Sequence, residues 1–171
     1  MSDNEELREQ LVGAWELISY IVHSEQTPST TLYPLGKDAK GIIMYTHDGY
    51  MSAQLQRPGQ VAFSAAHPVD GTEDELAESA RNYVGYTGPF HLDDDGPETI
   101  VLHHFLISSF PNWLGDTQRR KVKIEGDQLI ISLEASVDIK VRHYDILETS
   151  TNNIEVGRAV ESNSSMASSA E

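Results

Sequence analysis

The chain has 171 residues, of which 39% are hydrophobic, and its 27 acidic and 12 basic side chains give a formal charge of -15. This length and composition predict one soluble, folded domain with a sizeable core. A field of that sign repels phosphate backbones and anionic lipids, so neither nucleic acid nor a membrane is expected as a partner. The absence of cysteine excludes disulfides, thiolate metal sites and a cysteine nucleophile.

The sequence shows no targeting or spanning segment. Its first residues, MSDNEELREQLVGAW, are acidic and lack the apolar stretch of a secretory signal. No apolar run approaches the roughly 18–20 residues that a membrane helix needs. We therefore expect a cytoplasmic protein, with the oligomeric state open between monomer and homodimer.

The first part of the chain predicts a short helix followed by strands. Residues 1–10 form a helical lead-in, with the helix itself over 5–11 and Asp3 or Asn4 as its cap. Asp48-Gly49, between two strand candidates, is the signal of a tight hairpin. Residues rich in Val, Ile and Tyr predict strands at 11–22, 30–35, 41–46, 50–55, 83–91, 98–110, 118–124, 127–134 and 138–148.

One further helix is expected inside the fold. Residues 56–71 contain two prolines and two glycines and are expected to form a loop. Thr72, with Glu75 three residues later, then predicts a capping box at the start of a helix. The small polar residues from 161 to 171 are expected to be a disordered tail.

About eight or nine strands with short links and one short helix favour an all-β, antiparallel meandering barrel over residues 11–160. A β-sandwich is the alternative. Several strands are apolar or aromatic on both faces, which favours the barrel. An eight-stranded barrel either fills its interior with side chains or holds one small ligand there.

Two long stretches carry a family resemblance. They are YPLGKDAKGIIMYTHDGYMSAQLQRPG at 33–59 and HHFLISSFPNWLGDTQRR at 103–120, and Gly13-Ala14-Trp15 adds the Gly-x-Trp form found at the start of lipocalin barrels. Together they resemble the bacterial and fungal lipocalin-like domain family over roughly residues 11–148. The resemblance implies a calycin-type barrel with a central apolar cavity. Some fungal members belong to natural-product pathways, where small barrels of this kind resemble cofactor-free cyclases and isomerases, so the resemblance implies a similar activity.

Neither a metal site nor a nucleophilic site is expected. His103 and His104 are adjacent on a strand, so they point to opposite faces and cannot both bind one ion. The chain has no His-x-His or His-Glu-x-x-His spacing and no Gly-x-Ser-x-Gly elbow. No cofactor is expected.

Acid–base chemistry or ligand binding in an apolar cavity is the better hypothesis. Val122 and Ile124 predict the inward face of their strand, so Gln118 and Arg120 are expected inside the barrel. One of the two histidines is expected in the cavity, and we favour His104 over His103 because its face also carries Ser108. The polar groups available on the strands are Glu16, Tyr45, Tyr50, Gln54, Tyr83, Tyr86, His91, His103 or His104, Gln118, Arg120 and His143.

From these groups we predict a site. Trp113, after the proline that ends a strand, is expected to close the barrel end or cover the pocket. Tyr50 and Gln54 belong to the site only if the opposite, aliphatic face of their strand does not face the core. The predicted catalytic residues are His104, Tyr86 and Arg120, and the predicted ligand-binding residues are Trp15, Tyr50, Gln54, Tyr83, His103, Trp113 and Gln118.

The leading functional hypothesis is a cofactor-free cyclase, isomerase or dehydratase acting on a hydrophobic, oxygenated small molecule in polyketide or terpenoid biosynthesis. A dry cavity would hold the reactive conformation, and a histidine or tyrosine would move a proton. Arg120 or Gln118 would stabilise negative charge that develops on a carbonyl oxygen. The alternatives are a non-catalytic carrier that uses the same cavity and a structural protein with a filled interior.

Overall fold

The computed structural model describes residues 3–23, 31–93, 96–133 and 137–143. Within these ranges the helices are α1 (Asp3–Leu11) and α2 (Glu73–Arg81), and the short 3-10 turns are η1 (Pro68–Asp70) and η2 (Pro111–Trp113). The strands are β1 (Gly13–His23), β2 (Thr31–Leu32), β3 (Lys40–Tyr45), β4 (Tyr50–Gln56), β5 (Tyr83–Asp93), β6 (Ile100–His104), β7 (Ile107–Ser108), β8 (Thr117–Glu125), β9 (Gln128–Leu133) and β10 (Val137–His143).

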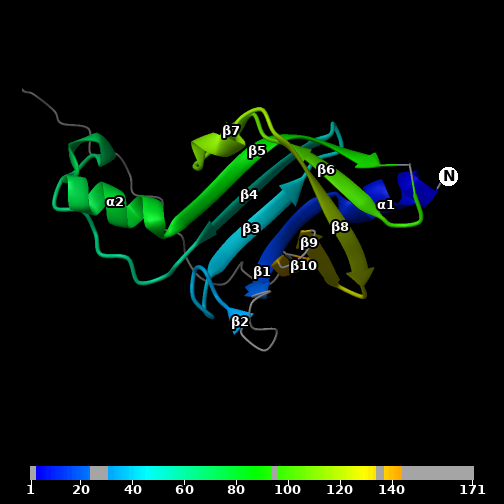
Figure 1. The fold of residues 1–171 in the computed structure, drawn as a ribbon, viewed down its shortest axis with the longest axis horizontal. Helices are drawn as coiled ribbons and strands as arrows, with labels where there is room; N and C mark the ends of the chain where they lie inside the picture. Colours follow the sequence, from blue (N-terminus) through cyan, green and yellow to red (C-terminus); the bar gives the residue numbers. More distant parts are fainter. Residues whose placement is uncertain (1–2, 24–30, 94–95, 134–136, 144–171) are drawn as a thin grey trace, which may run out of the picture.

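The strands close into an antiparallel barrel (Figure 1). In the described part of the chain eight strands follow one another around the ring in the order β1, β3, β4, β5, β6, β8, β9 and β10, and β10 then pairs with β1. The short strands β2 and β7 pair with the ends of β1 and β5 outside this ring. The predicted barrel is therefore confirmed, and the alternative of a sandwich is wrong.

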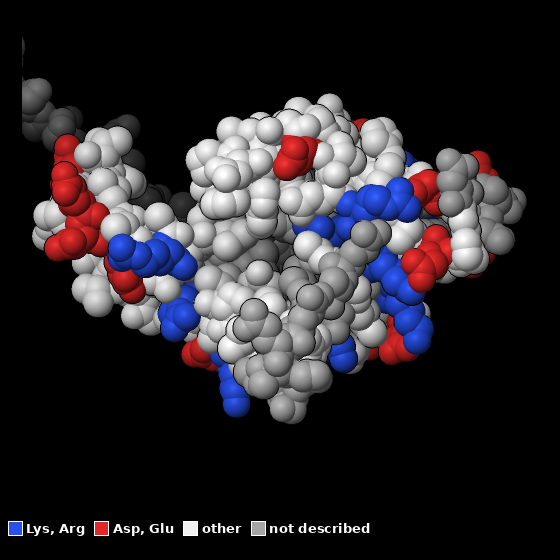
Figure 2. Space-filling model, viewed as in Figure 1, with Lys and Arg blue, Asp and Glu red and all other residues white. Residues whose placement is uncertain are grey.

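Alternation along the strands produces one continuous core inside the barrel. On β4, Met51, Ala53 and Leu55 are buried, while Tyr50 and Gln54 are exposed on the outer face. On β8 the outward basic residues pair with acidic neighbours, and Figure 2 shows this basic stripe along the outside of the strand. Burial of the inner faces is the main favourable contribution to folding. Inward hydrophobic residues from all eight ring strands join this core.

Helix α1 closes one end of the barrel. Leu11 is fully buried, and its carbonyl oxygen accepts a hydrogen bond of 2.8 Å from the indole nitrogen of Trp15. Arg8, one turn earlier, lies over the ring of Phe90 with 4.9 Å between the guanidinium carbon and the ring centroid. The hairpin between β3 and β4 lies at the same end, and Gly49 adopts the left-handed φ of 94° that its turn requires.

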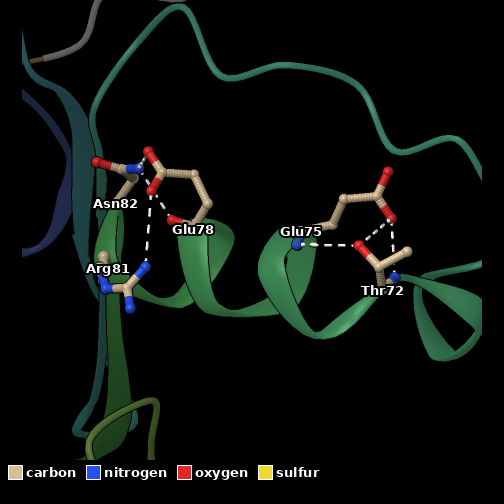
Figure 3. A network of polar contacts seen from close by, with 5 residues as sticks. All are labelled: Thr72, Glu75, Glu78, Arg81 and Asn82. Atoms are coloured by element: carbon tan, nitrogen blue, oxygen red, sulfur yellow. Dashed lines mark hydrogen bonds and ion pairs between the residues drawn. The ribbon is translucent and has the colours of Figure 1, made fainter.

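Helix α2 projects from the opposite end, where β4 ends and β5 begins (Figure 1). Its predicted capping box is present: the hydroxyl of Thr72 accepts a hydrogen bond from the backbone nitrogen of Glu75, and the Glu75 carboxylate accepts one from the backbone nitrogen of Thr72 (Figure 3). Acidic side chains gather on this projecting helix, as Figure 2 shows. No helix in the described ranges is long and apolar enough to cross a membrane.

The strand predicted over 98–110 is interrupted. Phe90 pairs with His103, but Thr87 pairs with Ile107, so the second strand gains one residue between the two pairings and forms a bulge. Pro89 lies on β5 where the ladder would continue, and it has no N–H to donate. Gly88 lets the chain pass close by, because a Cβ atom there would lie 1.9 Å from the carbonyl oxygen of His104.

Two predictions concern residues outside the described ranges. The last strand was expected to continue to 148, and the tail was expected over 161–171. The structure describes the strand only as far as His143. Near the other end of the chain, α1 spans Asp3–Leu11, where a helix was predicted over 5–11.

Candidate functional site

Polar side chains meet inside the barrel, where the other inward residues are mainly apolar. His103 on β6 is fully buried and Arg120 on β8 is 3% exposed. Both lie inside because they alternate with outward neighbours on paired strands, with His103 opposite Gln118 and Val101 opposite Arg120. Residues opposite each other in an antiparallel pair share a face, so Gln118 is directed inward with them.

Tyr45 on β3 contacts His103 across the interior. Its hydroxyl oxygen lies 3.0 Å from Nε2 of the imidazole, and both residues are buried. Burial lowers the pKa of His103 to about 3, and the positive charge of Arg120 contributes in the same direction. Burial also raises the pKa of Tyr45 well above its ordinary value. At neutral pH both groups are therefore uncharged, and they share one hydrogen bond.

Arg120 is surrounded by neutral groups. Its Nη2 donates a hydrogen bond to the side-chain oxygen of Gln118, and the guanidinium lies close enough to the Tyr86 hydroxyl to oppose the rise that burial causes in the pKa of that phenol. Its Nε atom has no hydrogen-bond partner among the described residues, and none of the carboxylates described contacts it. A guanidinium stays protonated in proteins, so a positive charge lies inside the barrel.

An apolar pocket adjoins this polar cluster. Its cavity volume is only about 10 Å³, so the pocket is narrow. Tyr86 belongs to both regions because it lines the pocket and lies close to Arg120. The pocket is lined by Leu17, Ile42, Ile43, Ala53, Leu55, Tyr86, Ile131, Ile139 and Val141.

Tyr86 is held in place by aromatic neighbours. Its ring centroid lies 4.7 Å from that of Phe105 and 5.9 Å from that of Trp113, which comes from η2. Burial raises the pKa of Tyr86, while the charge of Arg120 and its hydrogen bond oppose that rise. The phenol therefore stays protonated at neutral pH. An oxygen atom in the pocket would meet an O–H donor backed by a positive charge, which is a strong arrangement for binding or polarising an acceptor.

The structure brings together five of the predicted site residues. His103, Tyr86, Arg120 and Gln118 form the polar cluster, and Trp113 packs beside Tyr86. Trp15 is also inside, but its indole nitrogen bonds the backbone of Leu11 at the end closed by α1. Its packing identifies it as a core residue of that end.

Four predicted residues lie outside the barrel, and their expected positions are corrected. The prediction that His104 faces the cavity is wrong: its Nδ1 lies 2.9 Å from the Thr117 hydroxyl on the outer face. Tyr50 is 51% exposed, because the aliphatic residues of β4 face the core. Gln54 and Tyr83 line an outer groove beneath β7. The alternation that buries Tyr86 turns Tyr83 outward.

Two interior tyrosines were not selected from the sequence. Tyr45 was among the available polar groups, and its alternation with Ile43 on β3 was the signal that it faces inward. Tyr20 on β1 lies close enough for the charge of Arg120 to oppose the rise that burial causes in its pKa. No sequence signal identified Tyr20, because a bulge shifts the register of β1 between Leu17 and Ser19.

The chain is similar to several known proteins. A carrier protein of 4'-hydroxy-3'-methoxypropiophenone from Aspergillus oryzae is 41% identical over 86 residues, which span 48% of this chain and 78% of the relative. The crystal structure of the fluorescent protein UnaG aligns over 80% of this chain and 98% of its own, with 11% identity and a TM-score of 0.33. The family model of the lipocalin-like domain matches residues 12–149, and the chain therefore belongs to the lipocalin-like domain family.

Proposed function

We propose that this protein is a carrier that binds a small, oxygenated aromatic molecule inside its barrel. The observation that carries the proposal is the junction at Tyr86, where an apolar pocket meets a buried arginine. The apolar lining suits a hydrophobic ring, and the polar cluster suits one oxygen function of that ring. The relative named as a carrier of a hydroxylated, methoxylated aryl ketone supports this class of ligand.

The narrow pocket indicates that binding rearranges side chains. A substituted aromatic ring does not fit in a cavity volume of only about 10 Å³. The pocket is lined by aliphatic side chains, and those of Leu17 and Leu55 would have to change rotamer to admit a ligand. Their displacement weakens the net affinity, because part of the interaction energy offsets the rearrangement.

The direct experiment is calorimetric titration of the purified protein with 4'-hydroxy-3'-methoxypropiophenone, followed by chromatography of the recovered compound. A carrier is expected to release heat on binding, to gain thermal stability and to return the compound unchanged. The absence of both a binding heat and a stability gain would contradict the proposal. The structural hypothesis of a filled interior would then remain.

Catalysis is a second candidate function. Tyr86 and Arg120 lie side by side and can both donate to a carbonyl oxygen as it gains negative charge, as in a cofactor-free isomerisation or cyclisation. His104 has no part in this candidate because it lies on the outer face. The same chromatography separates the two functions: conversion of the ligand by the wild type, lost in Tyr86→Phe and Arg120→Met, would identify an enzyme.

A further inference from the structure

Arg120 is a buried charge whose described surroundings supply no counter-ion. Its side chain is 3% exposed, and its partners are the amide of Gln118 and the phenol of Tyr86. The other arginine on this strand, Arg119, shows the contrast: it lies on the outer face and pairs with Asp93. Burying a guanidinium without a carboxylate is unfavourable, and buried charges in folded proteins are ordinarily paired.

Among the residues that the structure describes, no titratable group that faces Arg120 supplies negative charge at neutral pH. These groups are Tyr20 from β1, Tyr45 from β3, Tyr86 from β5 and His103 from β6. Burial keeps all three phenols protonated and the imidazole neutral. The described interior therefore carries one net positive charge, and the unpartnered Nε of Arg120 is an available donor.

We propose that the barrel binds its ligand as an anion, and that the anion is the phenolate of an acyl-substituted phenol whose oxygen docks against Arg120 and Tyr86. This inference rests on the proposed function and adds the charge state of the ligand. On binding, the phenol O–H loses its proton to solvent, and the oxygen keeps the electron pair. An acyl group conjugated with the oxygen spreads the negative charge over the ring, which reduces the penalty for moving the anion into an apolar pocket.

Folding of the protein already desolvates the positive charge. A phenolate that enters the interior is then attracted by the Arg120 guanidinium. Binding carries no further cost of desolvating that guanidinium, because it is already buried. A neutral phenol gains only a hydrogen bond. An opposite charge at this range lowers a pKa by about one to three units, so the phenolate is expected to bind at least about tenfold more tightly than the phenol.

The test uses a spectroscopic property of the ligand. An acyl phenolate absorbs at longer wavelengths than its phenol and clear of protein absorption, so its ionisation is visible in the complex. We would titrate 4'-hydroxy-3'-methoxypropiophenone with pH, free and in the presence of excess wild-type protein. The expected result is a pKa of the bound phenol at least one unit below that of the free phenol. An unchanged or raised pKa in a demonstrably bound ligand would overturn the inference.

Matched ligands and variants locate the effect. The 4'-methoxy ether, 3',4'-dimethoxypropiophenone, cannot ionise and is expected to bind at least about tenfold more weakly than the phenol at a pH where the free phenol is fully ionised. Arg120→Met is expected to abolish the pKa shift of the bound phenol, and Arg119→Met to leave it unchanged. The wild-type titration needs no variant, so the test holds even if Arg120→Met fails to fold.

The two proposals fail in different ways. If neither the phenol nor its ether binds, the proposed carrier function is wrong. If both bind with equal affinity at every pH and the long-wavelength band does not appear in the complex, the carrier function stands and the anionic ligand is wrong. A pKa shift that persists in Arg120→Met would also overturn the assignment to this arginine.

Discussion

Two pairs of adjacent residues in the barrel wall place one member inside and one outside. His103 and Arg120 lie in the interior, whereas His104 and Arg119 bond partners on the outer face. The two members of each pair are the same residue type, one buried and one exposed. They differ because successive side chains on a strand point to opposite faces. The outward member of each pair therefore serves as a control for the inward one.

His103 is expected to make stability depend on pH. Its pKa is about 3 in the folded chain against 6.5 for an unperturbed histidine, so between these values the unfolded state takes up the extra proton. The free energy of unfolding is therefore unaffected by His103 above pH 6.5. Below that pH it decreases by about 1.4 kcal/mol per pH unit. Urea unfolding between pH 5 and 6.5, chosen to lie above the carboxylate range, measures this slope.

The control compares the two histidines. His103→Gln is expected to flatten the slope of unfolding free energy against pH, and His104→Gln to retain the wild-type slope. Backbone hydrogen bonds from Ser64 and Thr72 hold the pKa of Glu75 at about 2. Its contribution to the free energy of unfolding is therefore lost only below the pH range of this experiment. A wild-type slope in His103→Gln would show that another group carries the pH dependence.

Arg120 is expected to lower the stability of the ligand-free protein. Replacing a buried charge that lacks a carboxylate with an apolar side chain of similar length removes a desolvation penalty. Arg120→Met should therefore raise the free energy of unfolding by about 1 kcal/mol or more, measured in urea without ligand. Arg119→Met, which loses only a surface ion pair, should stay within about 0.5 kcal/mol of wild type. A less stable Arg120→Met would mean that the arginine supports the fold.

At the scale of elements, α2 depends on its own cap more than on the barrel. It projects away from the strands, and its first turn is closed by the hydroxyl of Thr72 and the carboxylate of Glu75 (Figure 3). Thr72→Ala should lower the local stability of α2 by about 0.5–2 kcal/mol, read from hydrogen exchange of its amides. Thr72→Ser keeps the hydroxyl and should retain protection. Equal exchange in the two variants would contradict a role for the cap.

Local signals predicted several elements, and the errors arose where distant segments decide the register. Asp48-Gly49 and Thr72 with Glu75 specify their turn and cap within four residues, and both are confirmed. Arg120 was placed inside because Val122 and Ile124 continue its face. The histidine assignment failed for a nonlocal reason: the face that His104 was expected to share with Ser108 is broken by a bulge opposite Gly88 and Pro89 on another strand.

At the scale of the whole molecule, barrel closure joins the two halves of the site. The polar cluster comes from β3, β5, β6 and β8, whereas much of the apolar pocket comes from β1, β4, β9 and β10. These strands become neighbours across the interior only because β10 pairs with β1. Residues far apart in sequence thereby surround one volume, which explains why no short motif identified the pocket.

Filling that volume tests where the ligand binds. Ala53 lines the inner pocket, and Gln54, the next residue on β4, lines the outer groove beneath β7. Ala53→Leu adds three carbons to the narrow pocket and should weaken binding of 4'-hydroxy-3'-methoxypropiophenone at least about tenfold, a loss of about 1.4 kcal/mol. Overpacking typically costs about 1–3 kcal/mol of stability, so the variant is expected to fold.

Gln54→Leu replaces an amide with a hydrocarbon in the outer groove without adding bulk, and it should bind the ligand as the wild type does. At a ligand concentration one hundred times the dissociation constant, wild type and Gln54→Leu should each gain about 2.7 kcal/mol of stability, and Ala53→Leu clearly less. Calorimetry and thermal unfolding with and without ligand measure both effects. If Gln54→Leu loses affinity and Ala53→Leu does not, the ligand occupies the outer groove rather than the inner pocket.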